Sequence, residues 1–138
     1  QGKEEYVSKL KSMAEELRIS DKVHFYGYSN DTNSIILESD FGVAPSIIQE
    51  GCHLVPMEFM KYGKAVIDTN NGAQPEFVKN NETGLLISPD NVIELTSAIS
   101  LLLDKKSFRE EIGKKAKAYL DNNLTYSKFL QEIMKNYQ

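Results

Sequence analysis

Apolar positions along the chain alternate between helical spacing and short continuous runs. Apolar residues at intervals of three and four are typical of a helix that buries one face, whereas a short apolar run closed by glycine or proline is typical of a buried strand. The short runs predict four strands, at Val23–Tyr26, Phe41–Ala44, Ala65–Asp68 and Leu85–Ile87. The helical spacing predicts helices between and around them, at residues 6–18, 33–38, 54–62 and in three stripes beyond residue 91.

Strands that alternate with helices favour a doubly wound α/β fold, in which helices cover both faces of a parallel sheet. The last two predicted strands are apolar on both faces, as expected of strands inside such a sheet. The chain begins with a helix rather than a strand, and four strands are few for this architecture. We therefore expect one domain over residues 1–138 with a Rossmann-like parallel sheet, whose first strand and a neighbouring N-terminal domain lie upstream of Gln1.

The length and composition suit one folded domain with one core, because the 138 residues are 41% hydrophobic and 26% charged. The longest apolar runs, such as Leu101–Leu103, are far shorter than the roughly 20 residues that a bilayer span needs. The single cysteine, Cys52, cannot form an internal disulfide, and the first residues lack the features of a secretory signal. We therefore expect a cytoplasmic protein.

The net charge is −4, and the positive charges are unevenly placed. Residues 23–100 contain three lysines and no arginine against ten acidic residues. This stretch is unsuited to nucleic acid, because affinity for a phosphate backbone comes from clustered Lys and Arg. The basic residues between 105 and 117 are interleaved with Glu110 and Glu111, which favours a solvated helix face. Weak peripheral contact with an anionic membrane surface is the alternative for that helix.

In doubly wound folds ligands bind at the carboxyl ends of the strands, so the segments after the strands are the candidate sites. The most informative segment runs from Ser46 to Leu54 and leads into a predicted helix. The first N–H groups of a helix lack intrahelical partners, and the helix dipole favours an anion beside them. We therefore expect this segment to bind a phosphate group. His53 within it is open to two interpretations, a ligand contact or a structural residue.

Two carboxylates accompany this turn, Glu50 before the helix and Glu58 inside it. A carboxylate accepts two hydrogen bonds side by side, which suits the neighbouring hydroxyl groups of a ribose or a hexose. The alternative is that Glu50 is a partner of the helix dipole and Glu58 is a solvated helix residue. The spacing alone leaves both interpretations open.

A second polar elbow, Thr69–Glu76, follows the third predicted strand. Gly72 permits a positive φ and a close approach of a ligand, and Pro75 begins a new helical turn. A plain strand-to-helix loop is the alternative for this elbow. His24 falls in a predicted strand, and two separated histidines with one cysteine do not form a metal-ligating pattern. The phosphate-loop, dinucleotide and nucleophile-elbow motifs are all absent from the sequence.

Five motifs occur in the order and spacing of a known family: Phe25-Tyr26-Gly27-Tyr28, Ala44-Pro45-Ser46, Glu50-Gly51 with Glu58 further on, Gly72–Glu76 and Thr83–Leu86. Each motif alone is weak, but their joint order is specific. Together they resemble the C-terminal, donor-binding domain of retaining GT-B glycosyltransferases of family 4, the glycosyl transferases group 1. The resemblance covers nearly the whole chain.

The resemblance implies the C-terminal half of a GT-B fold, and the donor-binding part of an enzyme of polysaccharide biosynthesis. Such an enzyme moves a hexose from a nucleotide-diphosphate sugar to a glycan or lipid-linked acceptor with retention at the anomeric carbon. By match to the motif, Glu58 would bind the ribose hydroxyls, the catalytic Glu50 would hold hydroxyls of the donor sugar, and the turn at Gly27 would lie beside the base. The residues expected at the donor are Gly27, Tyr28, Ser46, Glu50, Gly51, Cys52, His53, Leu54, Val55 and Glu58. No metal ion and no other cofactor is expected.

This chain departs from the family pattern in two places. The family usually has Glu-Gly-Phe-Gly-Leu where this chain has Glu50-Gly51-Cys52-His53-Leu54, and Ala73 replaces the second glycine of a Gly-Gly pair. Cys52 and His53 leave the identity of the donor sugar open, and Ala73 is expected to narrow the pocket slightly. The Arg and Lys that the family places near the diphosphate would precede Gln1, as would the acceptor-binding domain. We therefore expect this fragment to be inactive alone.

Three other functions fit parts of the pattern. One is a nucleotide-binding module that does not catalyse, and a second is a sugar-nucleotide epimerase of the same two-domain architecture. The third is a phosphoacceptor signalling domain, which needs an acidic pocket with a partner lysine, and Asp68 alone is a poor match to that requirement.

Overall fold

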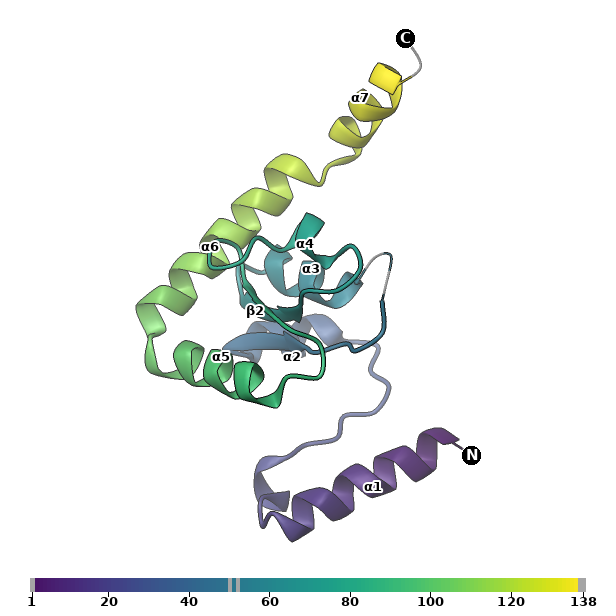
Figure 1. Ribbon diagram of the computed structural model, residues 1–138, viewed down its shortest axis with the longest axis vertical. Coiled ribbons are helices and arrows are strands. Elements are labelled where there is room, and N and C mark those ends of the chain that lie inside the picture. The colour runs from purple at the N-terminus through teal and green to yellow at the C-terminus, as the bar shows by residue number, and fades with distance from the viewer. Residues whose placement is uncertain (1, 50, 52, 137–138) are drawn as a thin grey trace. The chain divides into compact units, whose positions relative to one another are not determined.

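The computed structural model describes residues 2–49, 51 and 53–136 of the chain. These residues divide into two units, Gln1–Asp31 and Thr32–Gln138. Figure 1 shows the helices and strands of both. The second unit holds the parallel sheet and most of the predicted site.

The first unit consists of a helix and a short return segment. Helix α1 (Gly2–Glu16) covers most of the predicted helix, and a single 3-10 turn, η1 (Ser20–Lys22), follows it. Arg18 between them has a φ of 56°, the left-handed conformation that commonly closes a helix. The ammonium group of Lys11 lies 5.8 Å from the ring centre of Phe25, so a cation–π contact joins α1 to the return segment.

The predicted strand Val23–Tyr26 is wrong, because these residues form no strand in the structure. Val23 has the extended backbone of a strand, with φ −111° and ψ 117°. A strand also needs a neighbour to complete its ladder of hydrogen bonds, and the described part of the first unit contains no strand that could serve as one. The backbone at Val23 is therefore extended, as a strand requires, but the predicted pairing with a neighbouring strand does not occur among the described residues of this unit.

The second unit contains three parallel strands in the order β1-β2-β3: β1 (Phe41–Ala44), β2 (Ala65–Thr69) and β3 (Leu85–Ile87). Phe41 pairs with Ala65, and Ile67 pairs with Leu85. A helix lies in the sequence between each pair of neighbouring strands, which confirms the predicted α/β crossovers. The sheet has three strands in the described residues rather than four.

Strand β2 is the centre of the core, because all five of its residues are buried. Successive side chains of a strand point to opposite faces, so Ile67 and Val66 enter different clusters. Ile67 packs with β3 and with helices α5 (Val92–Asp104) and α6 (Lys106–Asn123), in a cluster formed by Ala65, Ile67, Leu85, Ile87, Ala98, Leu102 and Ile112. Val66 packs on the other face with Met60, Val78 and Ala116. Figure 1 accordingly shows α3 (Leu54–Lys61) and α5 on opposite sides of β2.

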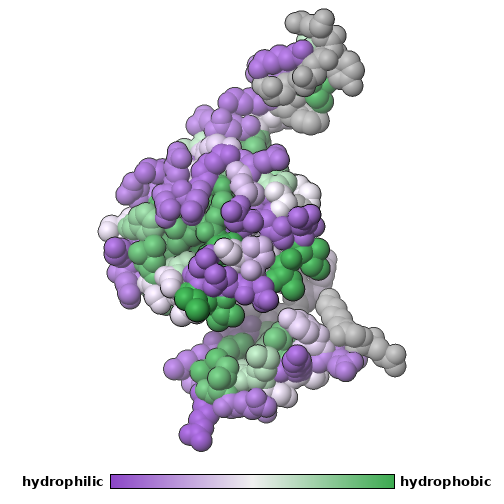
Figure 2. Space-filling model, in the orientation of Figure 1, coloured by the Kyte–Doolittle hydropathy of each residue, from purple (hydrophilic) through white to green (hydrophobic). Residues whose placement is uncertain are grey.

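The helices of the second unit are α2 (Thr32–Glu38), α3 (Leu54–Lys61), α4 (Gln74–Phe77), α5 (Val92–Asp104), α6 (Lys106–Asn123) and α7 (Tyr126–Asn136). All six fall where the sequence predicts a helix or a helical turn. In the described residues no helix is long and apolar enough to span a membrane. In the view of Figure 2, apolar side chains of this unit reach the surface in separate patches among polar ones.

Helix α6 carries the basic residues as a solvated face. Lys115 contacts Glu111 at 2.6 Å and Lys117 contacts Asp121 at 2.7 Å, each one turn apart, and all four side chains are at least half exposed. Arg109 is different, because its side chain is only 12% exposed and donates to the carboxylate of Asp40 at 2.7 Å. Lys115 and Lys117 are therefore paired within α6, and Arg109 fastens the helix to the start of β1.

Candidate functional site

The loop that follows β1 is fastened to the carboxyl end of β2. The hydroxyl of Thr69 donates to the carbonyl oxygen of Ser46 at 2.7 Å, and the side-chain amide of Asn71 donates to the carbonyl of Ile47 at 3.3 Å. Thr69 is 1% exposed, so its hydrogen bond is shielded from water. The first half of the predicted phosphate-binding segment is thus held in place by the strand beside it.

The second half of that segment is fastened by His53, the residue before α3. Its Nδ1 lies 3.2 Å from Oδ1 of Asp68, which is 1% exposed on β2. The same carboxylate oxygen accepts the backbone N–H of Thr69 at 2.8 Å. A buried carboxylate is stable only with such partners, and the pair therefore fixes both the rotamer of His53 and the position at which α3 begins.

The start of α3 is open to a ligand. His53 has extended backbone angles and its side chain forms no capping hydrogen bond, and the first turn contains no acidic residue. Because Pro56 has no N–H, the amides of Leu54 and Val55 are the main donors that this helix end presents. Leu54 is 62% exposed and Val55 is 39% exposed, whereas Pro56 is buried.

Glu58 lies on the exposed face of the same helix. It follows Leu54 by four residues, so the two share one side of α3, opposite the buried Met60. The Glu58 side chain is exposed and has no ion-pair partner among the described residues. An exposed carboxylate therefore lies one turn beyond the start of α3, on the same side of the helix as Leu54.

The structure brings together only part of the predicted donor set. Ser46, Gly51, His53, Leu54, Val55 and Glu58 belong to one loop and helix of the second unit. Glu50 and Cys52 lie outside the described residues. Gly27 and Tyr28 belong to the first unit, where Gly27 has a φ of 66° and Tyr28 is 89% exposed.

The second elbow forms a turn with one unexpected residue. Gly72 has a φ of 58°, as its predicted role in a tight turn requires, and the short helix α4 begins two residues later. Gln74 in α4 is 1% exposed, and both polar atoms of its side chain lack a hydrogen-bond partner among the described residues. Glu76 is exposed at the surface of the same turn.

A hollow of about 190 Å³ opens at the carboxyl ends of the strands. Pro45, Thr69 and Ser88, which lie at the ends of β1, β2 and β3, contribute to its walls together with Val92 of α5. This is the edge at which ligands bind in doubly wound folds. The hollow adjoins the fastened loop, because Ile47 is also in its wall.

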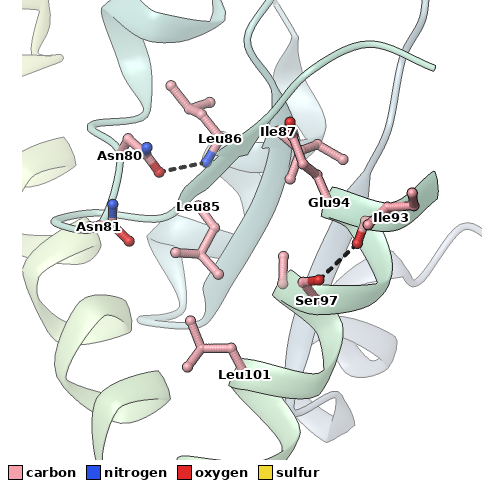
Figure 3. A pocket seen from close by; sticks show the side chains of 10 residues that line it. Asn80, Asn81, Leu85, Leu86, Ile87, Ile93, Glu94, Ser97 and Leu101 are labelled. Carbon is pink, nitrogen blue, oxygen red and sulfur yellow. Dashed lines mark hydrogen bonds between the residues drawn. The ribbon is translucent and has the colours of Figure 1, made fainter. Parts of the chain in front are cut away.

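A larger hollow, of about 330 Å³, lies between β3 and α5 (Figure 3). Its walls are mostly apolar, and Leu85 and Leu101 point into it. Asn80 lies at its rim, where the side-chain oxygen of Asn80 accepts a hydrogen bond from the N–H of Leu86 at 2.9 Å. None of the predicted site residues lines it. Its volume therefore does not make it the candidate site.

Sequence reasoning missed the residues that support the site. Asp68 was considered only as a phosphoacceptor, and Thr69 only as the first residue of an elbow. A usable signal was present, because a carboxylate at the end of an otherwise apolar strand must find a partner, and the adjacent loop contains one histidine. The other histidine, His24, is exposed in the first unit. The described residues contain no cluster of three or more potential metal ligands.

Comparisons with known proteins identify the family of the chain. The family model described as "Glycosyl transferases group 1" matches residues 1–119. The chain is 30% identical over 140 residues to the lipopolysaccharide 1,2-N-acetylglucosaminetransferase of Salmonella typhimurium, covering 98% of this chain and 36% of that protein. It is 28% identical over 123 residues to the N,N'-diacetylbacillosaminyl-diphospho-undecaprenol alpha-1,3-N-acetylgalactosaminyltransferase of Campylobacter jejuni, covering 85% and 32%. The chain thus spans about a third of the length of these relatives.

Solved structures share the fold. The crystal structure of Anabaena HepE in complex with UDP matches 99% of this chain and 37% of that one, with a TM-score of 0.90 and 24% identity. The same protein in complex with UDP-glucose matches with a TM-score of 0.88. WaaG, a glycosyltransferase involved in lipopolysaccharide biosynthesis, matches 91% of this chain and 34% of its own with a TM-score of 0.78 and 22% identity. The α/β fold is therefore that of the C-terminal part of a GT-B glycosyltransferase.

Proposed function

The chain belongs to the family of glycosyl transferases group 1, and from that membership we propose that it is the part of a retaining glycosyltransferase that binds the nucleotide-diphosphate sugar. The observation that carries the proposal is the uncapped start of α3, which β2 holds through Asp68 and Thr69 and which presents Glu58 on its exposed face. A helix start of this kind suits an anion, and the carboxylate suits a pair of hydroxyl groups.

The chemistry of sugar transfer gives these groups their roles. When the bond between the sugar and the diphosphate breaks, negative charge develops on the leaving diphosphate, and fixed N–H groups directed at it lower the barrier. The amides of Leu54 and Val55 fill this role, and Glu58 accepts the ribose hydroxyls. Glu50, by its match to the family motif, holds hydroxyls of the sugar. We propose that no metal ion takes part in this binding.

The remainder of the reaction requires groups outside this chain. We propose that the intact enzyme transfers a hexose to a glycan or lipid-linked acceptor that a separate N-terminal domain binds. The 138-residue chain by itself should then transfer no sugar. We place the protein in the cytoplasm, where lysines of α6 could give it weak peripheral contact with the inner membrane surface. The epimerase alternative is not favoured, because the relatives reported above are named as transferases.

A ligand-detected NMR screen of the purified chain tests the donor-binding role. The screen compares UDP, GDP and ADP with their nucleosides and with UDP-glucose. We expect the nucleoside diphosphates to bind and the nucleosides to bind far more weakly, since the helix start recognises the diphosphate. Equal binding of a nucleoside and its diphosphate would contradict the proposal, and so would the absence of binding by every diphosphate. Sugar transfer by the chain alone, at the rate of a full enzyme, would contradict the expected need for another domain.

A further inference from the structure

The contact between His53 and Asp68 has a second consequence, which rests on the donor-binding function proposed above. Amide groups alone can hold a diphosphate, and the family motif usually has glycine where this chain has His53. The imidazole is therefore an addition in this chain, and it is not left free. Its side chain is 14% exposed, and its Nδ1 lies 3.2 Å from the buried carboxylate of Asp68.

The geometry determines which ring nitrogen carries which proton. Carboxylate oxygens of an ionised Asp68 can only accept, so Nδ1 of His53 must be the donor in this contact. The carboxylate itself is held by the backbone N–H of Thr69 at 2.8 Å, which fixes it against rotation. The protonation of His53 can then change only at Nε2, which points away from Asp68 because the two ring nitrogens lie on different edges of the imidazole.

The charged groups around His53 leave Asp68 as its dominant partner. His53 contacts Asp68 of β2, which is the one ion-pair partner of His53 among the described residues. Helix α3 carries Glu58 and Lys61, and the elbow after β2 carries Glu76, and none of these forms an ion pair with His53. Glu50, in the same loop, lies outside the described residues.

We propose that Asp68 is a positioning residue that holds His53 with its Nε2 toward the diphosphate of the donor, and that donor binding takes up one proton from solvent at this Nε2. Without the proton, Nε2 offers a lone pair to an anionic oxygen and repels it. With the proton, His53 is an imidazolium that donates a hydrogen bond to the diphosphate while Nδ1–H remains on Asp68. Donor binding should therefore be tighter at low pH than at high pH.

The probe must not titrate in the same range. The terminal phosphate of a nucleoside diphosphate has a second ionisation near pH 6, which would mask the effect. UDP-glucose and GDP-mannose avoid this, because both phosphates are esterified and keep a constant charge. Calorimetry with each probe at pH 5.5 and pH 8.0, in two buffers of different ionisation enthalpy, measures both the affinity and the number of protons taken up.

The variants separate the roles of the two residues. His53→Gln keeps a polar side chain but cannot gain a proton, so its affinity should become independent of pH. The wild-type chain should lose about tenfold in affinity over the same interval, the size expected of one hydrogen bond to a charged group. Asp68→Asn keeps the shape and an acceptor oxygen but removes the negative charge beside the imidazolium, so its donor affinity at pH 5.5 should fall below that of wild type. His24→Gln, at the exposed second histidine, is the matched control and should behave as wild type.

NMR of the imidazole nitrogens gives a readout that needs no ligand. The Nδ1–H tautomer of His53 should dominate in the wild type when the ring is neutral and should lose that dominance in Asp68→Asn. Binding with the same pH dependence in wild type and His53→Gln, or an unchanged tautomer in Asp68→Asn, would overturn this inference and leave the donor-binding function standing. Binding of neither probe at either pH would overturn both.

Discussion

The backbone of Gly113 in α6 lies directly against the carbonyl group of Gly63, the residue that follows the end of α3. A β-carbon on Gly113 would overlap that carbonyl oxygen. Gly63 has a φ of 67°, and the N–H of Lys64, which shares a peptide plane with the Gly63 carbonyl, donates to the carbonyl of Phe59 at 3.0 Å, so the Gly63 carbonyl is held in place. The close approach therefore sets the distance between α6 and the helix that presents the candidate site.

Gly113→Ala should destabilise the protein. In an exposed helix, replacing glycine with alanine would raise the free energy of unfolding by up to about 1 kcal/mol, because alanine has the higher helix propensity. Here the added methyl group meets fixed backbone, and overpacking of this kind costs about 1–3 kcal/mol, so the net effect is a loss. Chemical denaturation measures the difference, with Lys114→Ala at the exposed neighbouring position as control. An increase in stability for Gly113→Ala would show that the two helices separate freely.

Glu58→Gln should weaken the binding of a nucleoside diphosphate by at least about tenfold, because hydrogen bonds to a charged group are worth roughly 1.5–3 kcal/mol each. The amide keeps the shape of the side chain but accepts at one atom only. A 2′-deoxy ligand should lose much of its sensitivity to the change, since one of the partner hydroxyls is already absent. Calorimetry on the four combinations of protein and ligand gives a double-mutant cycle.

The control for the loss of negative charge at Glu58 is Glu76→Gln, which removes the same charge from the neighbouring elbow. It should leave affinity unchanged. A coupling energy near zero between Glu58 and the 2′-hydroxyl would identify Glu58 as a solvated helix residue, the alternative that its sequence position allows.

Gln74→Met should stabilise the protein by about 1 kcal/mol or more, because it removes two buried polar atoms that lack partners among the described residues. Methionine has a similar length and fills the same space with apolar atoms. Thermal unfolding measures the change against Gln131→Met, at an exposed position of α7. Stability lost at position 74 would indicate that the amide of Gln74 has a partner that the described residues do not include.

Lys115 holds the pKa of the Glu111 carboxyl below its usual value, through a hydrogen bond and the attraction of opposite charges. Reciprocally, Glu111 raises the pKa of Lys115. The Glu111 carboxylate therefore stabilises the folded protein at a pH above its unfolded-state pKa. This stabilisation is lost as the pH falls through the lower pKa that Glu111 has in the folded protein. The ammonium adds stability below its unfolded-state pKa and loses it as the pH rises through the raised value. Lys115→Gln should return the pKa of Glu111 toward its ordinary value in a carboxyl NMR titration, and Lys117→Gln should not.

Most of the sheet could be predicted from the sequence because its strands begin with short apolar runs, at Phe41, Ala65 and Leu85. Burial supports this signal most strongly in β2, where all five residues are buried, and less in β1, where Val43 is partly exposed. Val23–Tyr26 has similar composition but no partner strand in its unit, and composition does not reveal partners. The helix that begins at Leu54 was predicted through Pro56, whose ring suits the first turn of a helix.

The candidate site was predicted only where it depends on position along the chain. The segment from Ser46 to Leu54 could be proposed because it follows a strand and precedes a helix. The contact of His53 with Asp68 joins residues 15 positions apart, and the hydrogen bond of Thr69 to Ser46 joins residues 23 apart. Such pairings depend on which strands are neighbours, and sequence spacing does not specify that.

Asp68 and Thr69 are consecutive residues of the central strand, and their side chains fasten the two ends of the loop that leads to α3. Asp68 holds His53, and Thr69 holds Ser46. Both ends of the loop are therefore held by side chains of adjacent residues on β2, and Asn71, just beyond them, adds a hydrogen bond to Ile47. We expect substitutions between the two anchors to change what the loop recognises more than they move the helix start that follows it. The arrangement separates the part of the site that can diverge among donors from the part that must stay in place.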